Sequence, residues 1–492
     1  MKIEQINRKA LFYSLLGIIM LFGMFLRLDV YFFNRPFWHD ECSLASNILG
    51  KGYISYFGVL DLIQSAPPIF MIISKYIFNL FPNYPEYALR FIPCLSSILA
   101  IFFFYLLLDK IFSNKLCILV GTFLFSFNFQ LIYYAQEFKQ YSSDVLMIIL
   151  SFLMFSKINI IDLSGNKKKC FAIALMLLIF PFISLPTMFV IGAFLLFNFI
   201  KYSQKRLLLV LVSVPMLIAN ALYYIYTLKP AKEIMLGTYF DMWAPGFLGF
   251  NLSKNVNLLL NNFEFVFTAC KYAVIPLLLF LIGIYIAYKR NKSIDQLLNI
   301  SLLFVGIASF LHIYPIKERV SLYLIPILIV FVLYSFVIDF KKNKLISTIL
   351  MSSMLVFLSG YGFNYIKNIP YNPIFKRKDP RSTMQELIKH YKGHELIVYN
   401  DASLSELVFY GNYYKFLNKD IKLVRINLSD YGEEWYYSVL KILPKGNSYW
   451  FYYPNDYVKK PVIPWLKNWI KNNAKIIYEY EKDTSYLVLV EI

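Results

Sequence analysis

Long apolar runs separated by short polar breaks fill the first three quarters of the chain. Because a membrane-spanning helix needs ~20 mostly apolar residues, these runs predict about eleven spans, some of them short. The spans are expected near residues 10–28, 88–108, 116–132, 142–160, 170–184, 186–200, 207–226, 269–288, 295–313, 319–339 and 345–363. The predicted fold class is therefore a polytopic α-helical membrane protein.

The segment 171–200 could form two spans or one kinked span, and a single span would invert the topology of everything after it. It is divided at Ser184-Leu185-Pro186 because basic residues flank both of its ends. The first apolar run follows Arg8 and Lys9 as a signal peptide does, but no small-residue cleavage site precedes Arg27. This run is interpreted as a retained anchor.

Basic residues occupy alternate breaks between the apolar runs, and such clusters mark the cytoplasmic face. They are Lys2, Arg8 and Lys9; Lys110 and Lys115; Lys167, Lys168 and Lys169; Lys201, Lys205 and Arg206; Lys289, Arg290 and Lys292; and Lys341, Lys342 and Lys344. An odd number of spans then predicts that the C-terminal stretch lies outside the cytoplasm, in a multi-pass protein of the cell (inner or plasma) membrane.

Two long connections fall on the predicted external side. The first, residues 29–87, contains an apolar run from Pro67-Pro68 to Phe81 that is short for a span, so a helix on or re-entering the membrane surface is expected. The second, residues 227–268, is rich in Tyr, Trp and Asn and is placed to cover a site from above.

From about Lys376 the pattern changes to short amphipathic units, which predicts a transmembrane domain at 1–375 and a soluble extracytoplasmic domain at 376–492. The spacing of Ser382 to Gln385 fits a capping box at its start. Helices are expected at 383–391, 404–413, 434–442 and 464–473, and strands at 395–399, 421–426, 449–453, 475–480 and 486–490. This alternation predicts a small α/β domain with a largely parallel sheet. It has no Gly-rich phosphate loop, so a nucleotide-binding role is not expected.

Composition supports the membrane assignment, since 58% of the 492 residues are hydrophobic and the mean hydropathy is +0.54. A net charge of +19 would suggest nucleic acid as a partner of a soluble chain, but here the basic residues are explained by orientation in the bilayer. The five cysteines are scattered without metal-ligand or disulfide spacing.

An acidic pair directly after the first span is the strongest candidate for chemistry. It lies in Phe37-Trp38-His39-Asp40-Glu41, at a membrane boundary. Carboxylates beside the apolar zone are costly and usually face a cavity where they pair, bind ions or react. The alternative is an exposed acidic pair at the start of a helix.

Three further polar patches share the predicted external side: residues 64–68 with 86–93, residues 134–141, and residues 314–319. A transferase that uses a lipid-phosphate sugar needs cations for the phosphate, and the candidates are Arg90, Lys139 and Arg319. Its leaving group is a stable anion, so one base suffices, and Asp40 fits that role, with Glu41 beside it as the second catalytic candidate. The residues expected to position the substrate are His39, Gln64, Glu137 and Tyr141, and Glu41 or Glu137 is the candidate to position the acceptor or a metal. A divalent metal is left open.

Each of these assignments has a simpler alternative. Arg90 and Arg319 are also typical of interface cations that extend to the lipid headgroups. Glu137 and Lys139 are spaced to pair with each other at a helix end. His39 is more typical of a hydrogen-bonded structural residue than of a metal ligand.

The ordered motifs resemble membrane glycosyltransferases of the C-type fold, in particular the bacterial protein mannosyltransferase-like family (family 39) and the lipid A aminoarabinose transferases. The resemblance rests on Trp38-His39-Asp40-Glu41, Ala66-Pro67-Pro68, residues 88–93, residues 134–141, Pro315 to Arg319 with Tyr323 and Pro326, Val398-Tyr399-Asn400 and Phe409-Tyr410. It implies that Asp40 is the catalytic base, that the donor is a polyprenyl-phosphate sugar and that the acceptor belongs to the cell envelope.

One departure from the resemblance narrows the prediction. Aminoarabinose transferases carry a lysine before the two prolines, where this chain has Ala66. A donor-phosphate contact is missing there, which argues against lipid A modification and requires Lys139, Arg90 or Arg319 to supply the charge.

Two other functions fit a polytopic chain with external basic residues. A polysaccharide polymerase or flippase is the main alternative, although it needs neither an acidic pair after the first span nor a folded C-terminal domain. A non-enzymatic receptor that binds a partner through that domain is the third.

Overall fold

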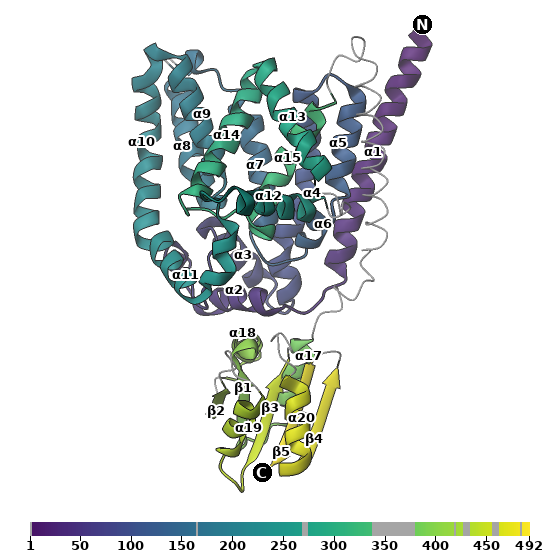
Figure 1. Cartoon of the computed structure of the whole chain (residues 1–492), viewed down its shortest axis with the longest axis vertical. Coiled ribbons are helices and arrows are strands. Elements are labelled where there is room, and N and C mark those ends of the chain that lie inside the picture. Colours follow the sequence, from purple (N-terminus) through teal and green to yellow (C-terminus); the bar gives the residue numbers. More distant parts are fainter. Residues whose placement is uncertain are drawn as a thin grey trace.

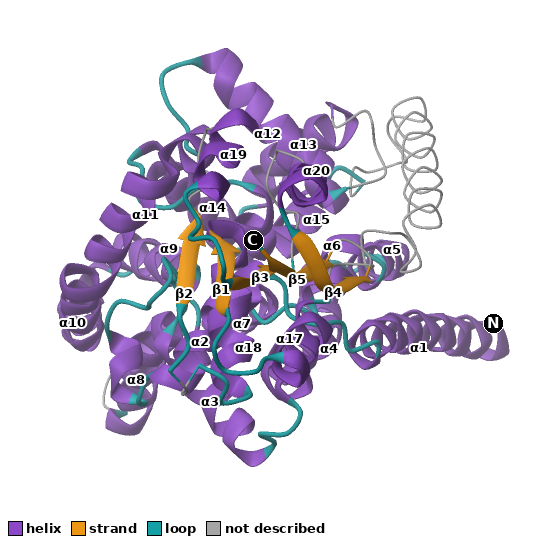
Figure 2. Ribbon diagram, turned by 90° about the horizontal axis from the view of Figure 1, so that it is seen from below, coloured by secondary structure: helices purple, strands orange, loops and turns teal. Residues whose placement is uncertain are grey.

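A body of helices and a small domain with a β-sheet make up the molecule (Figure 1). The computed structural model describes residues 2–163, 166–267, 274–336, 379–417, 420–426, 433–454, 462–482 and 485–492. Seen from below, the strands of the small domain lie over the middle of the helical body, while α1 extends to one side (Figure 2).

Among the residues that the structure describes, four helical segments are long and apolar enough to cross a membrane: Lys9–Phe32, Pro85–Ile111, Ser203–Gly237 and Ser293–Phe310. Four apolar helices among the described residues are shorter: Pro68–Leu80, Lys115–Ser126, Tyr141–Phe155 and Thr187–Lys201. The α-helices of the body are α1 (Lys2–Phe32), α2 (His39–Gly50), α3 (Pro68–Leu80), α4 (Pro85–Ile111), α5 (Lys115–Ser126), α6 (Phe129–Tyr134), α7 (Tyr141–Phe155), α8 (Lys167–Ile183), α9 (Thr187–Lys201), α10 (Arg206–Tyr223), α11 (Lys229–Trp243), α12 (Leu252–Val266), α13 (Val274–Arg290), α14 (Ser293–Phe310) and α15 (Ile325–Tyr334). A 3₁₀ segment, η6 (Glu318–Leu324), precedes α15.

Every predicted span before residue 340 overlaps a helix, and the segment 345–363 lies outside the described residues. The division at Ser184-Leu185-Pro186 is confirmed, since α8 ends at Ile183 and α9 begins at Thr187. Ser184 has the extended backbone φ of −156°, which ends the helix. A total of eleven spans stays a prediction.

The predicted span 116–132 is wrong as a single helix. It breaks between α5 and α6, where the Asn128 side chain accepts a hydrogen bond from the Leu131 N–H at 3.1 Å and donates to the Val266 carbonyl at 2.8 Å. The buried Arg27 guanidinium donates to the carbonyl of Ser126 at 2.8 Å, at the end of α5. These polar partners replace the helical hydrogen bonds lost at the break.

The two predicted external loops are largely helical. The apolar run from Pro68 forms the short helix α3, as expected. In the second loop, α10 continues through one π-helical turn at Tyr224–Leu228 into α11, so the predicted end of that span at residue 226 is too early.

The small domain contains α17 (Pro380–His390), β1 (Leu396–Asn400), α18 (Leu404–Tyr413), β2 (Leu423–Ile426), α19 (Glu433–Lys441), β3 (Ser448–Tyr453), α20 (Val462–Asn473), β4 (Lys475–Lys482) and β5 (Ser485–Glu491). Its strand order is β2-β1-β3-β5-β4. β1 is parallel to β2 and β3, but β5 is antiparallel to β3 and β4. The prediction of a largely parallel sheet therefore holds for β1, β2, β3 and β4, which point the same way, and fails for β5, which enters between β3 and β4 in the opposite direction.

The start of the domain differs from the sequence prediction by three residues. Asp379, not Ser382, caps α17 and accepts a hydrogen bond from the Ser382 N–H at 2.9 Å. Pro380 occupies the first helical position, where its missing N–H removes no helical hydrogen bond.

One apolar cluster joins the domain to the body. Phe37, Phe70 and Phe138 from the body pack in the same cluster as Phe409 and Tyr410 from α18. This shared core holds α18 against α2, the helix whose first turn contains Asp40.

Candidate active site

Asp40 lies in the first turn of α2 and forms an ion pair with Arg319 of η6. The Arg319 Nη2 and Asp40 Oδ2 atoms are 2.5 Å apart, and the two side chains are 19% (Asp40) and 23% (Arg319) exposed. The Arg319 guanidinium also lies over the ring of Trp38, 5.4 Å from its centroid. Asp40 is therefore the carboxylate of the acidic pair that keeps contact with solvent.

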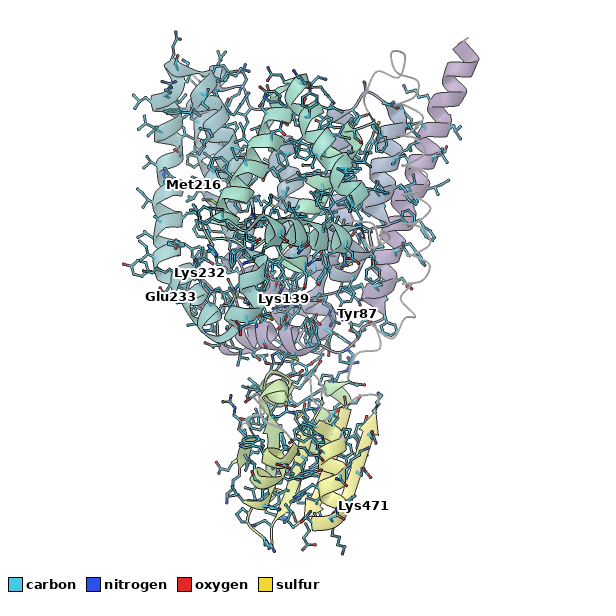
Figure 3. The ribbon with its side chains drawn as sticks, viewed as in Figure 1. Tyr87, Lys139, Met216, Lys232, Glu233 and Lys471 are labelled. Atoms are coloured by element: carbon cyan, nitrogen blue, oxygen red, sulfur yellow. The ribbon has the colours of Figure 1, made fainter. Side chains whose placement is uncertain are left out.

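A second cation, Lys139, acts on Asp40. Burial opposes the ionisation of Asp40, but the positive charges of Lys139 and Arg319 and the hydrogen bond from Arg319 outweigh it, so the pKa of Asp40 is below its ordinary value. Lys139 is buried and donates to Gln64 Oε1 at 2.5 Å, and burial lowers its pKa. Figure 3 labels Lys139 low in the helical body, near α2.

Glu41 points into the protein and is fully buried. Arg90 grips it with two hydrogen bonds, from Nε to Oε1 at 2.8 Å and from Nη2 to Oε2 at 2.7 Å, and the Phe138 N–H donates to Oε1 at 2.7 Å. Burial works against the charge, but Arg90 and Arg35 outweigh it and hold the pKa of Glu41 below its ordinary value. Glu41 is an ionised carboxylate with its oxygens already occupied.

Arg90 is buried with Glu41 and also donates to the backbone carbonyls of Arg35 and Pro36. Its guanidinium lies 4.8 Å from the centroid of the Phe37 ring. This geometry favours a structural role for Arg90 in holding the segment before Asp40, in place of the predicted contact with donor phosphate.

Arg35 belongs to the group of charged side chains around Asp40 and Glu41, and the sequence did not predict this role for it. It is buried, and its Nη2 lies 3.7 Å from Glu41 Oε2 and 3.8 Å from Glu137 Oε2. It comes just after a span, where an arginine looks like an ordinary interface cation. Its place in the site becomes visible only in the structure, where residues 133–137 contact the Arg35 side chain.

Glu137 lies between two arginines. Arg319 Nη1 is 3.9 Å from its Oε1 and Arg35 is on its other side, yet neither of its carboxylate oxygens has a hydrogen-bond partner. Burial raises the pKa of Glu137, and the nearby charge of Glu41 adds to this effect while Arg319 opposes it. The simpler alternative paired Glu137 with Lys139, but the ion pairs that the structure gives to Glu137 are with Arg35 and Arg319.

The remaining predicted site residues surround this cluster. Gln64 follows Leu62 and Ile63, whose φ angles of 56° and 55° lie in the left-handed region that side chains rarely adopt. His39 Nδ1 lies 3.4 Å from Glu406 Oε2 in the small domain. Tyr141 begins α7 and packs edge-to-face on Tyr134, with 5.5 Å between ring centroids.

Residues from all four patches of the predicted external side therefore meet in space: Asp40, Gln64, Lys139 and Arg319. Among the described residues, no three His, Cys, Asp or Glu side chains gather so as to hold a metal ion. The carboxylates of the cluster face arginines. The use of a divalent cation stays open to assay.

Family profiles match no part of this chain, and no curated protein matches it in sequence. Solved structures match it in fold. ArnT from Cupriavidus metallidurans in the apo state has a TM-score of 0.54 and 11% identity, covering 96% of this chain and 97% of that one. ArnT bound to undecaprenyl phosphate has a TM-score of 0.56 and 11% identity, covering 99% and 98%.

A weaker match is the Archaeoglobus fulgidus oligosaccharyltransferase, with a TM-score of 0.46 and 14% identity over 80% of this chain; the chain spans only 61% of its length. The two ArnT structures share the fold of nearly the whole chain, small domain included, so the predicted resemblance to proteins of the C-type fold is confirmed at the level of the fold.

Proposed function

We propose that this protein is a membrane glycosyltransferase that moves a sugar from a polyprenyl-phosphate donor to a hydroxyl of a cell-envelope glycan, lipid or protein on the external face. The observation that carries the proposal is Asp40, a partly exposed carboxylate flanked by the cations of Arg319 and Lys139. A base beside two phosphate-binding cations is what displacement of a phosphate from a sugar requires.

In the proposed reaction, Asp40 accepts the proton of the acceptor hydroxyl as its oxygen attacks the anomeric carbon. The bond from that carbon to the phosphate oxygen breaks, and the electron pair leaves with polyprenyl phosphate. Arg319 and Lys139 hold the phosphate and stabilise the negative charge that develops on it. Direct displacement of this kind inverts the configuration of the anomeric carbon.

Two observations support a lipid-phosphate donor. A fold neighbour over the whole chain, ArnT, has been solved with undecaprenyl phosphate bound. In this chain Lys139 places its ammonium on Gln64, two residues before Ala66, which supplies a positive charge near the position where the aminoarabinose transferases carry lysine. Of the other two candidates for binding the donor phosphate, Arg319 lies beside Asp40 and is retained, while Arg90 is paired with Glu41 and is not.

Glu41 has a supporting role in this proposal. With Arg90 and the Phe138 N–H as partners, it anchors the first turn of α2 in the protein interior. Glu137, paired loosely between Arg35 and Arg319, keeps carboxylate oxygens that can receive hydrogen bonds from a bound sugar or acceptor.

Asp40→Asn tests the function directly, because the amide keeps the shape of the side chain but cannot accept the proton. We expect turnover to fall at least ~10²-fold while donor binding is retained. The assay supplies a purified polyprenyl-phosphate sugar with a cell-envelope extract as acceptor source and follows release of polyprenyl phosphate. Asp61→Asn is the matched control, since the Asp61 side chain is 69% exposed and pairs with Lys51. Near-normal turnover by Asp40→Asn would overturn the mechanism.

A further inference from the structure

Helix α18 of the small domain contacts the Asp40 segment on both sides of Asp40. The Phe37 N–H donates to the Tyr410 hydroxyl at 2.9 Å, three residues before Asp40. The hydroxyls of Ser43 and Ser405 are 2.7 Å apart, three residues after it. On α18, positions 405, 406, 409 and 410 share one helical face, and this face is buried against α2.

Tyr410 connects this segment to a second helix of the body. Its fully buried hydroxyl donates to Glu86 Oε1 at 2.9 Å while it accepts from the Phe37 N–H. Arg381 of α17 also pairs with Glu86, at 3.4 Å. Glu86 lies one helical turn before Arg90 in α4, and Arg90 grips Glu41.

The hydroxyl of Tyr410 thus satisfies two buried polar groups that belong to the walls of the site. A buried backbone N–H needs a partner, and the Phe37 N–H has its partner, the Tyr410 hydroxyl, in the other domain. The ring of Phe37 continues the connection, packing edge-to-face on Phe409 with centroids 5.3 Å apart and lying under the Arg90 guanidinium. The position of residues 37–41 is therefore set from both domains.

We propose that the C-terminal domain is a structural part of the active site, that Tyr410 is the residue through which it positions Asp40, and that transfer takes place with α18 docked on α2. The part of this proposal that concerns transfer rests on the function proposed above. The part that concerns positioning does not.

Tyr410→Phe tests the positioning role because it keeps the ring and removes both hydrogen bonds. We expect kcat to fall roughly ten- to a hundredfold, because a displacement of about 1 Å at a reacting group costs that much, with the donor KM unchanged. Tyr413→Phe is the matched control, since Tyr413 lies on the same helix and its hydroxyl donates only to the Pro82 carbonyl, at an exposed position. Wild-type kcat in Tyr410→Phe would overturn the proposal.

A second readout separates this proposal from the proposed function. Cys42 is buried beside the Phe37 carbonyl, so its reaction with a thiol reagent reports opening of the segment without any assay of transfer. In a background with Cys94, Cys117, Cys170 and Cys270 replaced by alanine, Tyr410→Phe should react faster at Cys42 than Tyr413→Phe. Equal rates would overturn the positioning role even if Asp40→Asn were inactive. Faster reaction together with an active Asp40→Asn would overturn only the proposed function.

A cross-link tests whether docking is compatible with turnover. In a Cys42→Ala background, Ser43→Cys combined with Ser405→Cys should form a disulfide, because the two native oxygens are in contact. We expect the cross-linked enzyme to keep its activity. An enzyme that is inactive when oxidised and recovers on reduction would show that α18 must leave α2, which would overturn the proposal.

Discussion

The Asp40–Arg319 ion pair places the candidate base and the candidate phosphate ligand in direct contact before any substrate binds. A donor phosphate that binds Arg319 and Lys139 competes for the charges that now stabilise ionised Asp40. Its own negative charge further disfavours a second anion nearby. Donor binding is therefore expected to raise the pKa of Asp40 and make it a stronger base at the moment it is needed.

The rise in the pKa of Asp40 on donor binding predicts that kcat/KM and kcat depend differently on pH. The pKa of Asp40 in the free protein is lowered, so the acid limb of kcat/KM should lie below about 3.9, the ordinary value for aspartate. The acid limb of kcat, which reports the donor complex, should lie at higher pH. Steady-state profiles of the purified enzyme would show this, with incubation at low pH followed by assay at pH 7 as the control for irreversible loss. Coincident limbs would contradict the rise in pKa on donor binding.

The lowered pKa of Asp40 also makes the stability of the folded protein depend on pH. Because the folded pKa is below the unfolded one, the contribution is present above about pH 3.9 and is lost as the pH falls through the folded pKa.

Arg90 and Arg319 looked equivalent in sequence, and substitutions should separate them. Removing one partner of a buried ion pair costs about 3–5 kcal/mol, so Arg90→Gln and Glu41→Gln should lower the melting temperature clearly while the folded fraction binds donor normally. Arg319→Ala should instead weaken donor binding roughly ten- to a hundredfold, the equivalent of a charged hydrogen bond of about 1.5–3 kcal/mol. The measurements are thermal unfolding and donor titration of each purified variant. An Arg90→Gln enzyme of unchanged stability with weakened donor binding would restore the sequence-based assignment.

At the scale of single residues, sequence order identified most of the charged residues but not their partners. Asp40, Lys139 and Arg319 were recognisable as external charges, and the structure brings them together. The structure also pairs Glu41 with Arg90 and brings Arg35 close to Glu41. These pairs depend on how helices far apart in sequence approach one another. No local pattern in the chain carries that information.

The elements of the small domain were predictable to within three residues at each end, because each helix and strand has its own amphipathic spacing. The direction of β5 was not, since parallel and antiparallel strands share the same alternation. The break between α5 and α6 was not predictable either, because a hydropathy window averages over the single polar residue Asn128. Its side chain provides hydrogen bonds that make the break possible.

The turn that presents Gln64 is strained, and this gives a prediction at the scale of the element. A left-handed conformation costs an L-residue about 1–2 kcal/mol, and Ile63 adopts it with a branched side chain. Ile63→Gly should therefore melt no lower than the wild type, although glycine in an unstrained position destabilises by about 0.5–1 kcal/mol. Val59→Gly, in the same loop but without a left-handed φ, is the control and should melt lower. Equal destabilisation of both variants would show that Ile63 is not strained.

At the scale of the whole molecule, the alternating basic clusters predict a cytoplasmic N-terminus, with residues 39–41 and the C-terminal domain outside. Docking of α18 on α2 requires these two parts to be on the same side of the membrane, whichever side that is. A C-terminal alkaline phosphatase fusion should be active, and a cytoplasmic reporter at the same point inactive. The reverse pair of results would move the whole site to the cytoplasmic face.

The contact between Phe37 and Tyr410 joins residues 373 positions apart in the chain. During synthesis, the acidic pair emerges with the first membrane helix, but the hydroxyl that holds its segment is made only after the last span. A nascent or truncated chain therefore has Asp40 without the support that aligns it, even when its membrane helices have already inserted. If Tyr410 positions Asp40 as proposed, activity is expected only after the C-terminal domain is complete and folded, so a chain that is still being made is not expected to transfer sugar.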